Sequence, residues 1–153
     1  MNKMKKALFF FIVMSVSMCS TYSQNKKIRG RVITDQLEPV PGALIAINDT
    51  LVVGKTDVDG FFQIDIPIPI NKIFFKYVGL EPTNIELVDK CDKVEVIMIL
   101  SGTYDFITLD QVDKVRRKKF KKLPRLHKEA FEKGLFETKE ACYKQEFIAY
   151  SKE

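Results

Sequence analysis

The sequence predicts a mainly β protein: a seven-stranded sandwich of two sheets, followed by a short C-terminal α-helical extension. Between residues 27 and 100, apolar residues alternate or form short blocks, with turn residues about every ten positions, and no long stretch has helical spacing. After residue 101 the apolar residues recur near helical spacing instead. This change of pattern divides the chain into a β domain, residues 24–100, and an extension, residues 101–153.

The first half of the β domain contains four predicted strands, KIRGRVIT, ALIAI, LVVGKT and FFQIDI. In the first strand, Ile28 and Val32 share a face that we expect to be buried, and Ile33 lies on the opposite, solvated face. Before the second strand, Pro41 and Gly42 predict a loop, because proline donates no ladder hydrogen bond and glycine accepts turn conformations.

The turn before FFQIDI has the sequence TDVDG, whose two aspartates raise the alternative of a calcium loop. In an EF-hand loop with Gly60 at its sixth position, the first ligand position is Lys55 and the twelfth is Ile66, so a cation and an apolar residue replace oxygen ligands. We therefore expect Asp57, Asp59 and Gly60 to form a turn, with Asp57 bonded to the backbone and Gly60 at positive φ.

The second half of the β domain contains three predicted strands, KIFFKYV, TNIELV and VEVIMIL. In the first of these we expect Ile73, Phe75 and Tyr77 to point inward. Gly79 belongs to the turn that follows. The last strand is apolar over most of its length, which predicts that it is largely buried.

The extension begins with a predicted helix, TLDQVDKVRRKKFKKL, in which Thr108 and Gln111 have the spacing of a capping box. Pro124 is expected to end this helix, and a second short helix, RLHKEAFEKG, would end at Gly134. The residues that follow favour neither helix nor strand. Their many aromatic side chains, such as Phe147, predict that they pack against the rest of the protein.

Residues 1–23 are typical of a secretory signal peptide, since three lysines precede an apolar run that is short for a membrane span. We expect cleavage between Ser23 and Gln24. Lipidation of Cys19 stays open as an alternative, although Met18 is bulky at a position where a lipoprotein signal has a small residue. An uncleaved anchor helix is a further alternative.

The charge of the chain is divided unevenly. The formal net charge is +5, and removing residues 1–23 removes three lysines and no acid, which leaves +2. Residues 24–100 contain nine Lys and Arg against eleven Asp and Glu, whereas residues 101–153 contain thirteen against nine. A basic extension beside a slightly acidic domain indicates two parts with different roles.

Two cysteines remain after residue 23, Cys91 in the β domain and Cys142 in the extension. A disulfide between them would contribute on the order of 4 kcal/mol in the chain-entropy model and would join the extension to the domain. A pair of buried thiols is the alternative. The sequence does not fix the distance between the two residues, so both alternatives stay open.

Four segments, IRGRVIT, PVPGALIAI, GKTDVDGFFQI and FKYVGLEP, resemble in their order and spacing the carboxypeptidase regulatory-like domain family. The resemblance spans residues 28–100 and implies a transthyretin-like (prealbumin-like, Ig-like) β-sandwich. Members of this family precede TonB-dependent outer-membrane receptors, or occur in exported peptidases and in small stand-alone proteins of the Gram-negative envelope. The resemblance therefore implies an exported, stand-alone protein, in the periplasm, at the outer membrane or secreted. It transfers no catalytic residues.

We expect no catalytic, cofactor or metal site. The single histidine, His127, is too few for a zinc peptidase site and is expected on a solvated helix face. The GKT segment at Gly54 lacks the earlier glycine of a phosphate-binding loop. Ser101 and Ser151 have no histidine in a recognisable catalytic order, and Cys91 has no evident activating base.

The strongest functional pattern is the segment KVRRKKFKKLPRLHK, residues 114–128, in which nine of fifteen residues are Lys or Arg. Each basic residue near an anionic surface contributes about 1 kcal/mol, which favours contact with lipid phosphates, lipopolysaccharide, an acidic glycan or an acidic partner. Alternatively, the helix covers the sandwich and its lysines stay solvated. Nucleic acid is disfavoured, because Phe120 is the only aromatic residue of the segment. The candidate contacts are Lys114, Arg116, Arg117, Lys118, Lys119, Lys121 and Lys122.

These observations favour a non-enzymatic exported binding or scaffold module of the cell envelope that acts through protein or glycan contacts. The alternative is an accessory subunit of an outer-membrane, TonB-type or secretion assembly, whose basic segment contacts the membrane surface. A carboxylate-only enzyme is a weaker third alternative. The ligand and the oligomeric state do not follow from the sequence.

Overall fold

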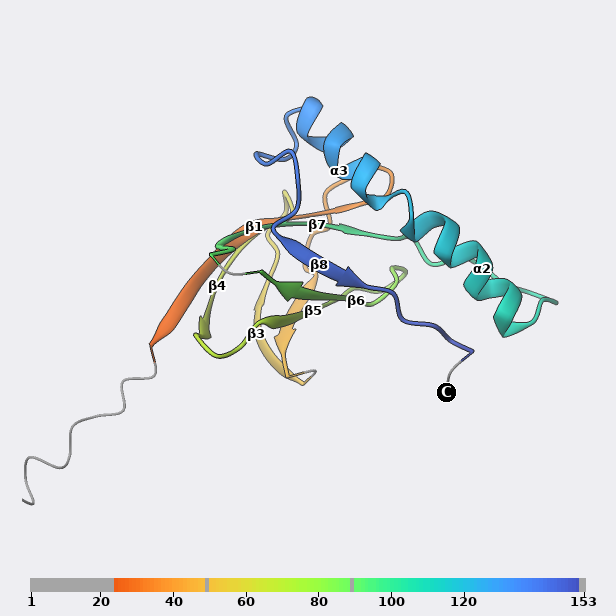
Figure 1. The fold of residues 1–153 in the computed structure, drawn as a ribbon, viewed down its shortest axis with the longest axis horizontal. Helices are drawn as coiled ribbons and strands as arrows, with labels where there is room; N and C mark the ends of the chain where they lie inside the picture. Colours follow the sequence, from red (N-terminus) through yellow and green to blue (C-terminus); the bar gives the residue numbers. More distant parts are fainter. Residues whose placement is uncertain (1–23, 49, 89, 152–153) are drawn as a thin grey trace, which may run out of the picture.

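A computed structural model describes residues 24–48, 50–88 and 90–151 of the chain. The predicted signal peptide, residues 1–23, lies outside the described residues, as does Cys19 within it. The described part is mainly β, as the sequence predicts, with two sheets and a pair of helices on one side of the strands (Figure 1).

The strands form one three-stranded and one five-stranded sheet. In the first, β1 (Asn25–Thr34) pairs antiparallel with β4 (Phe61–Pro67) and parallel with β7 (Lys93–Met98). In the second, the order is β3, β2, β5, β6, β8, and all neighbours are antiparallel. The strands of this sheet are β2 (Leu44–Ile47), β3 (Leu51–Lys55), β5 (Lys72–Lys76), β6 (Thr83–Leu87) and β8 (Tyr143–Glu146).

The described residues contain eight strands: seven before residue 100, the number expected there, and one more in the extension. The additional strand, β8, comes from the stretch for which the sequence favoured neither helix nor strand. Its residues 143–146 pair with residues 84–87 of β6, which would otherwise leave unpaired N–H and C=O groups at the sheet edge. The extension therefore completes a sheet of the β domain.

The main hydrophobic core lies between the two sheets. The alternating apolar residues of β1 and β4 line it as predicted, and Phe62 meets Phe75 edge to face, with 5.6 Å between ring centres. Gly30 lets β1 and β7 approach, since a Cβ atom there would lie 1.6 Å from the carbonyl oxygen of Val94. β3 lies against β4 at one side of the sandwich, and side chains of β8 reach β7 at the other.

A second core lies on the outer face of the three-stranded sheet, beneath α3 (Leu123–Glu132). Ile97 of β7 and Ile99, just after that strand, belong to it, so the β7 segment is buried on both faces. Ile33 also belongs to it. The prediction that Ile33 is solvated is wrong, because the helical extension covers this face of β1. The other buried members are Leu123, Ala130 and Phe136.

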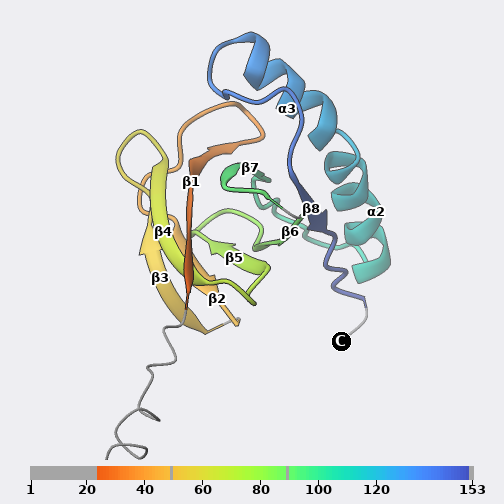
Figure 2. The same cartoon turned by 60° about the vertical axis from the view of Figure 1, so that its left-hand side comes forward.

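The first helix, α2 (Leu109–Phe120), begins at the predicted capping box. The backbone N–H of Gln111 donates to Thr108 Oγ1 (3.4 Å), and the N–H of Thr108 donates to Gln111 Oε1 (3.1 Å). These two bonds satisfy backbone donors that the helix itself leaves free. Figure 2 shows α2 and α3 stacked end to end along one side of the molecule, with β8 beside them.

Two local predictions are wrong. Pro124 does not end the first helix, which stops at Phe120; it lies in the first turn of α3, where its missing N–H breaks no helical hydrogen bond. Tyr77 does not point inward but is 37% exposed, because β5 ends at Lys76 and the chain turns.

The TDVDG segment forms a turn between β3 and β4. Asp57 Oδ1 accepts the N–H groups of Asp59 (3.0 Å) and Phe61 (2.8 Å), and the N–H of Gly60 donates to the carbonyl of Asp57 (3.1 Å). Gly60 has φ 80°, and a Cβ atom there would lie 2.4 Å from the carbonyl oxygen of Val32, so the position requires glycine. The other predicted turn residues also lie in turns: Pro41, Gly42 and Gly79.

Cys91 and Cys142 form a disulfide, with their Cα atoms 5.5 Å apart. Of the two alternatives left by the sequence, the structure contains the bridge. Cys142 directly precedes β8, and its carbonyl accepts the N–H of Val88 just after β6 (3.1 Å). The bond therefore holds the extension at the point where β8 enters the sheet.

Replacing both cysteines with alanine is expected to lower the free energy of unfolding by about 4 kcal/mol, since the bond closes a separation of 51 residues in the unfolded chain. Urea denaturation of the wild type and of C91A/C142A measures the difference. Reduced wild-type protein is the matched control and should lose a similar amount. A loss below about 1 kcal/mol in both samples would contradict a bridge that stabilises the fold.

Candidate functional site

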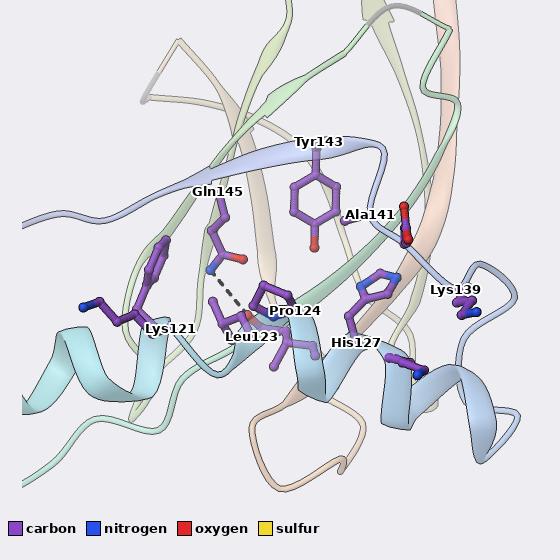
Figure 3. Close-up of a pocket in the computed structure, with 12 residues that line it drawn as sticks. Lys121, Leu123, Pro124, His127, Lys139, Ala141, Tyr143 and Gln145 are labelled. Atoms are coloured by element: carbon purple, nitrogen blue, oxygen red, sulfur yellow. Dashed lines mark hydrogen bonds between the residues drawn. The ribbon is translucent and has the colours of Figure 1, made fainter.

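A pocket of about 570 Å³ lies between α3, the outer face of β7, and β8. This volume falls within the range of small-molecule sites. Figure 3 shows Tyr143 and Gln145 projecting from β8 toward the residues of α3. The lining residues are Ile97, Phe120, Lys121, Leu123, Pro124, His127, Lys128, Lys139, Glu140, Ala141, Tyr143 and Gln145.

The α3 wall of the pocket follows from helical periodicity. Leu123, His127 and Ala130 recur at helical spacing and are buried toward the sheet, and Lys128, next to His127, lies at the edge of the same wall. The facing wall follows from strand periodicity, because Tyr143 and Gln145 are alternate residues of one strand. The pocket therefore exists only where a helix face and a strand face are brought together.

Tyr143 and Gln145, the two polar side chains of β8 in the pocket, donate hydrogen bonds to the edge of β7. The Tyr143 hydroxyl donates to the carbonyl of Glu95 (2.7 Å), and Gln145 Nε2 lies 3.5 Å from the carbonyl oxygen of Ile97. Burial raises the pKa of Tyr143, so this hydroxyl keeps its proton and remains a donor. These contacts satisfy carbonyl groups on the side of β7 where none of the described strands pairs with it.

Glu95 is a buried carboxylate between the apolar residues Val94 and Val96 of β7. Its oxygens accept the backbone N–H of Glu137 (2.6 Å), the N–H of Thr138 (2.9 Å) and the hydroxyl of Thr138 (2.5 Å). Three donors compensate for the loss of water around the charge. Glu95 thus fixes the loop that leads from α3 to β8 and shapes one end of the pocket.

His127 is buried, so the prediction of a solvated position is wrong. One ring nitrogen, Nε2, lies 3.1 Å from the carbonyl oxygen of Thr138, and the ring lies 4.8 Å from that of Phe136. Burial lowers the pKa of His127 although the charge of Glu95 opposes the shift, so the imidazole is neutral at neutral pH. His127 contributes an uncharged surface to the pocket.

The rim of the pocket is mainly cationic. Lys121, Lys128 and Lys139 line it together with the single acid Glu140. Lys128 also lies 3.9 Å from Glu132, an exposed and therefore weak ion pair. An apolar interior with ammonium groups at its edge suits a ligand that has an apolar body and an anionic end.

The predicted anionic-surface contacts differ in how far the structure exposes them to solvent. Arg116 is buried, so its assignment to the exposed basic face is wrong. Lys119 is half-buried and donates to the carbonyl of Leu100 (3.0 Å). The others are exposed: Lys114, Arg117, Lys118, Lys121 and Lys122.

Arg116 is the centre of a buried polar cluster that joins α2 to the β domain and to the C-terminal segment. Its guanidinium bonds to Glu81 Oε2 (2.7 Å from Nε) and to Asp113 Oδ1 (2.8 Å), and it donates to the carbonyl of Ile148 (2.8 Å). It also lies 3.6 Å from the ring centre of Tyr150. Arg116 therefore holds α2 in place and does not face an external anion.

Asp113 links the same cluster to the last residues of the described chain. Its carboxylate accepts the backbone N–H groups of Tyr150 (3.0 Å) and Ser151 (3.0 Å). These bonds, the one to Tyr150 first, hold the pKa of Asp113 well below its usual range despite burial. The aromatic C-terminal segment, which the sequence predicts to be packed, is thereby attached to α2.

Sequence reasoning missed Glu95, which holds the loop before β8, and the lining residues that this loop and β8 contribute: Lys139, Glu140, Ala141, Tyr143 and Gln145. A charged residue inside the run VEVIMIL was the one available indication, since a buried carboxylate needs donors from elsewhere in the chain. The lining residues lie on β8 or in the loop before it, a stretch whose pattern favoured neither helix nor strand.

No protein-family model matches the chain, and a search of the curated proteins finds no match. Within residues 24–151, apart from positions 49 and 89, no group of three or more His, Cys, Asp or Glu side chains is placed to hold a metal ion. No helix in the same described part is long and apolar enough to cross a membrane.

Replacing Arg116 with methionine is expected to lower the free energy of unfolding by about 3–5 kcal/mol, because Glu81 and Asp113 would lose their shared buried cation. The matched control is the adjacent Arg117→Met, an exposed position where we expect a loss below about 1 kcal/mol. Chemical denaturation compares the two variants. Equal effects of the two substitutions would refute the assignment of Arg116 to the cluster.

Proposed function

We propose that this chain is a non-catalytic binding module of the cell envelope that takes up an amphipathic anionic ligand in the pocket between α3, β7 and β8. The observation that carries the proposal is the combination of an apolar pocket with the ammonium groups of Lys121, Lys128 and Lys139 at its rim. A glycan would require several free hydrogen-bonding groups inside the pocket. The polar side chains of β8 that line the pocket, Tyr143 and Gln145, already bond to β7. The ligand class is therefore an acyl or other apolar chain that ends in a carboxylate, sulfate or phosphate.

The envelope assignment rests on the sequence. Residues 1–23 support export, and the resemblance to the carboxypeptidase regulatory-like domain supports a transthyretin-like sandwich as the scaffold. The seven strands before residue 100 and their division between two sheets are consistent with that scaffold. In this proposal the β domain is the rigid frame, and the extension supplies α3 and β8, two of the three walls of the binding site.

Dodecanoate is expected to bind the wild-type protein at least about tenfold more tightly than dodecyltrimethylammonium, which has the same chain and the opposite charge, because the rim is cationic. Isothermal titration calorimetry below the micellar concentrations measures both affinities. Ala141→Trp, which places an indole in the pocket, should abolish dodecanoate binding. Val78→Trp, at an exposed position outside the pocket, is the matched control and should bind normally. Equal affinity for the two detergents, or normal binding by A141W, would remove the support for this site.

A second function, attachment to an anionic surface, is favoured by a separate observation. Five exposed cations of α2 and the α2–α3 junction make no ion pair with any described residue. Uncompensated like charges one helical turn apart, such as Lys114 and Lys118, destabilise a helix slightly, so their presence suits an external anionic partner. These basic-face residues are Lys114, Arg117, Lys118, Lys121 and Lys122.

Replacing Lys114, Lys118 and Lys122 together with glutamine is expected to weaken binding to phosphatidylglycerol-containing vesicles by about 100-fold, at about 1 kcal/mol for each lysine. The control triple, Lys27, Lys55 and Lys76 to glutamine, changes the net charge equally on the β domain and should bind like the wild type. Vesicle co-sedimentation at low and high salt measures both. Binding that persists unchanged at high salt would contradict electrostatic attachment.

A further inference from the structure

The loop that leads into α2 exposes a cluster of apolar side chains, which we call the tip: Phe106, Ile107 and Leu109. Phe106 is fully exposed at 106%, and Leu109 and Ile107 are 57% and 42% exposed. Figure 1 shows this loop at the edge of the molecule, at the end of α2 remote from α3. Three apolar residues within four positions, all facing water at one extremity, are unfavourable unless something covers them.

The local structure fixes the tip in this exposed arrangement. Phe106 has φ 64°, a conformation that costs a non-glycine residue on the order of 1 kcal/mol or more. The capping box of Thr108 and Gln111 then sets the direction in which the chain enters α2. Neither the main core nor the second core includes a tip residue. The apolar side chains are thus held outward by the backbone.

The surroundings of the tip indicate what covers it. Along the helix axis, Lys114 lies roughly 8 Å from Leu109, and Arg117 and Lys118 follow within the next turn or so. The exposed acids close to the tip are Asp105 and Asp110, so the five cations of the basic face outnumber them. A segment that binds a bilayer interface has the same arrangement: its apolar side chains are buried about 5–10 Å deep, and its cations lie at the level of the lipid phosphates. A neutral protein surface would leave the cations uncompensated.

We propose that the tip inserts into the interface of an anionic lipid bilayer while the basic face binds the lipid phosphates. The inference rests on the second proposed function, attachment to an anionic surface, and adds an apolar anchor to it. Electrostatic attraction brings α2 to the surface, and the burial of Phe106 and Leu109 then makes the contact specific for a bilayer over other polyanions. The bilayer is the occupant, and α2 orients the molecule on it.

The chain contains no tryptophan, so a single Phe106→Trp substitution gives a local reporter. In the full chain, the fluorescence emission of F106W should shift to shorter wavelength on vesicles of phosphatidylcholine with phosphatidylglycerol, and should not shift on phosphatidylcholine alone. The matched control is Val78→Trp, which is 93% exposed in the β5–β6 turn and should show no shift. Every variant contains the same residues 1–23, so any contribution of that segment is common to all.

A second variant, Phe106→Asp, should weaken vesicle binding by about tenfold or more, whereas Val78→Asp should not. If F106W co-sediments with anionic vesicles but its emission is unchanged, insertion is overturned and attachment by charge alone stands. If neither wild type nor F106W binds vesicles at low salt, both insertion and attachment are overturned. Dodecanoate binding tests the pocket independently, so its success or failure does not depend on either result.

Discussion

The structure depends on the burial of the β7 segment from both sides. One face of this strand contributes to the main core between the sheets, and the other, with Ile97 and the adjacent Ile99, contributes to the second core under α3. A strand in this position exposes too much apolar surface for a two-layer sandwich alone, so a further layer has to cover it. The helical extension is that layer, and this explains why the β domain and the extension share cores, a sheet and a disulfide.

Backbone carbonyl groups at the free edge of β7 need hydrogen-bond donors, and the side chains that supply them shape the pocket. Side chains of β8 bond to the carbonyls of Glu95 and Ile97, while the Glu95 carboxylate holds the loop before β8. Because β8 reaches β7 through long side chains and not through backbone pairing, a gap remains between the strand and α3. The candidate ligand pocket is this gap, and its walls are held by bonds that do not involve a ligand.

The Arg116 cluster has a different role, since it makes α2 a rigid projection. With Glu81, Asp113 and Tyr150 around its guanidinium, the inner face of α2 is fixed to the β domain and to the C-terminal segment. The outer face then consists of solvated cations, and the tip lies at its end. The proposed ligand uptake and the proposed attachment through α2 would thus use different parts of one extension, which meet at Lys121.

The sequence by itself determined the seven strands before residue 100, the turns between them and the start of α2, because these depend on interactions within a few residues. Alternation in FFQIDI places Phe62 inward, Gly60 is required by its turn, and Thr108 with Gln111 caps a helix whatever surrounds it. Only the tertiary structure decided the burial of Ile33, His127 and Arg116, the pairing of β8, and the pocket. A side chain on a strand or helix surface looks the same in sequence whether water or another layer covers it, and the covering layer here comes from more than 80 residues further along the chain from Ile33.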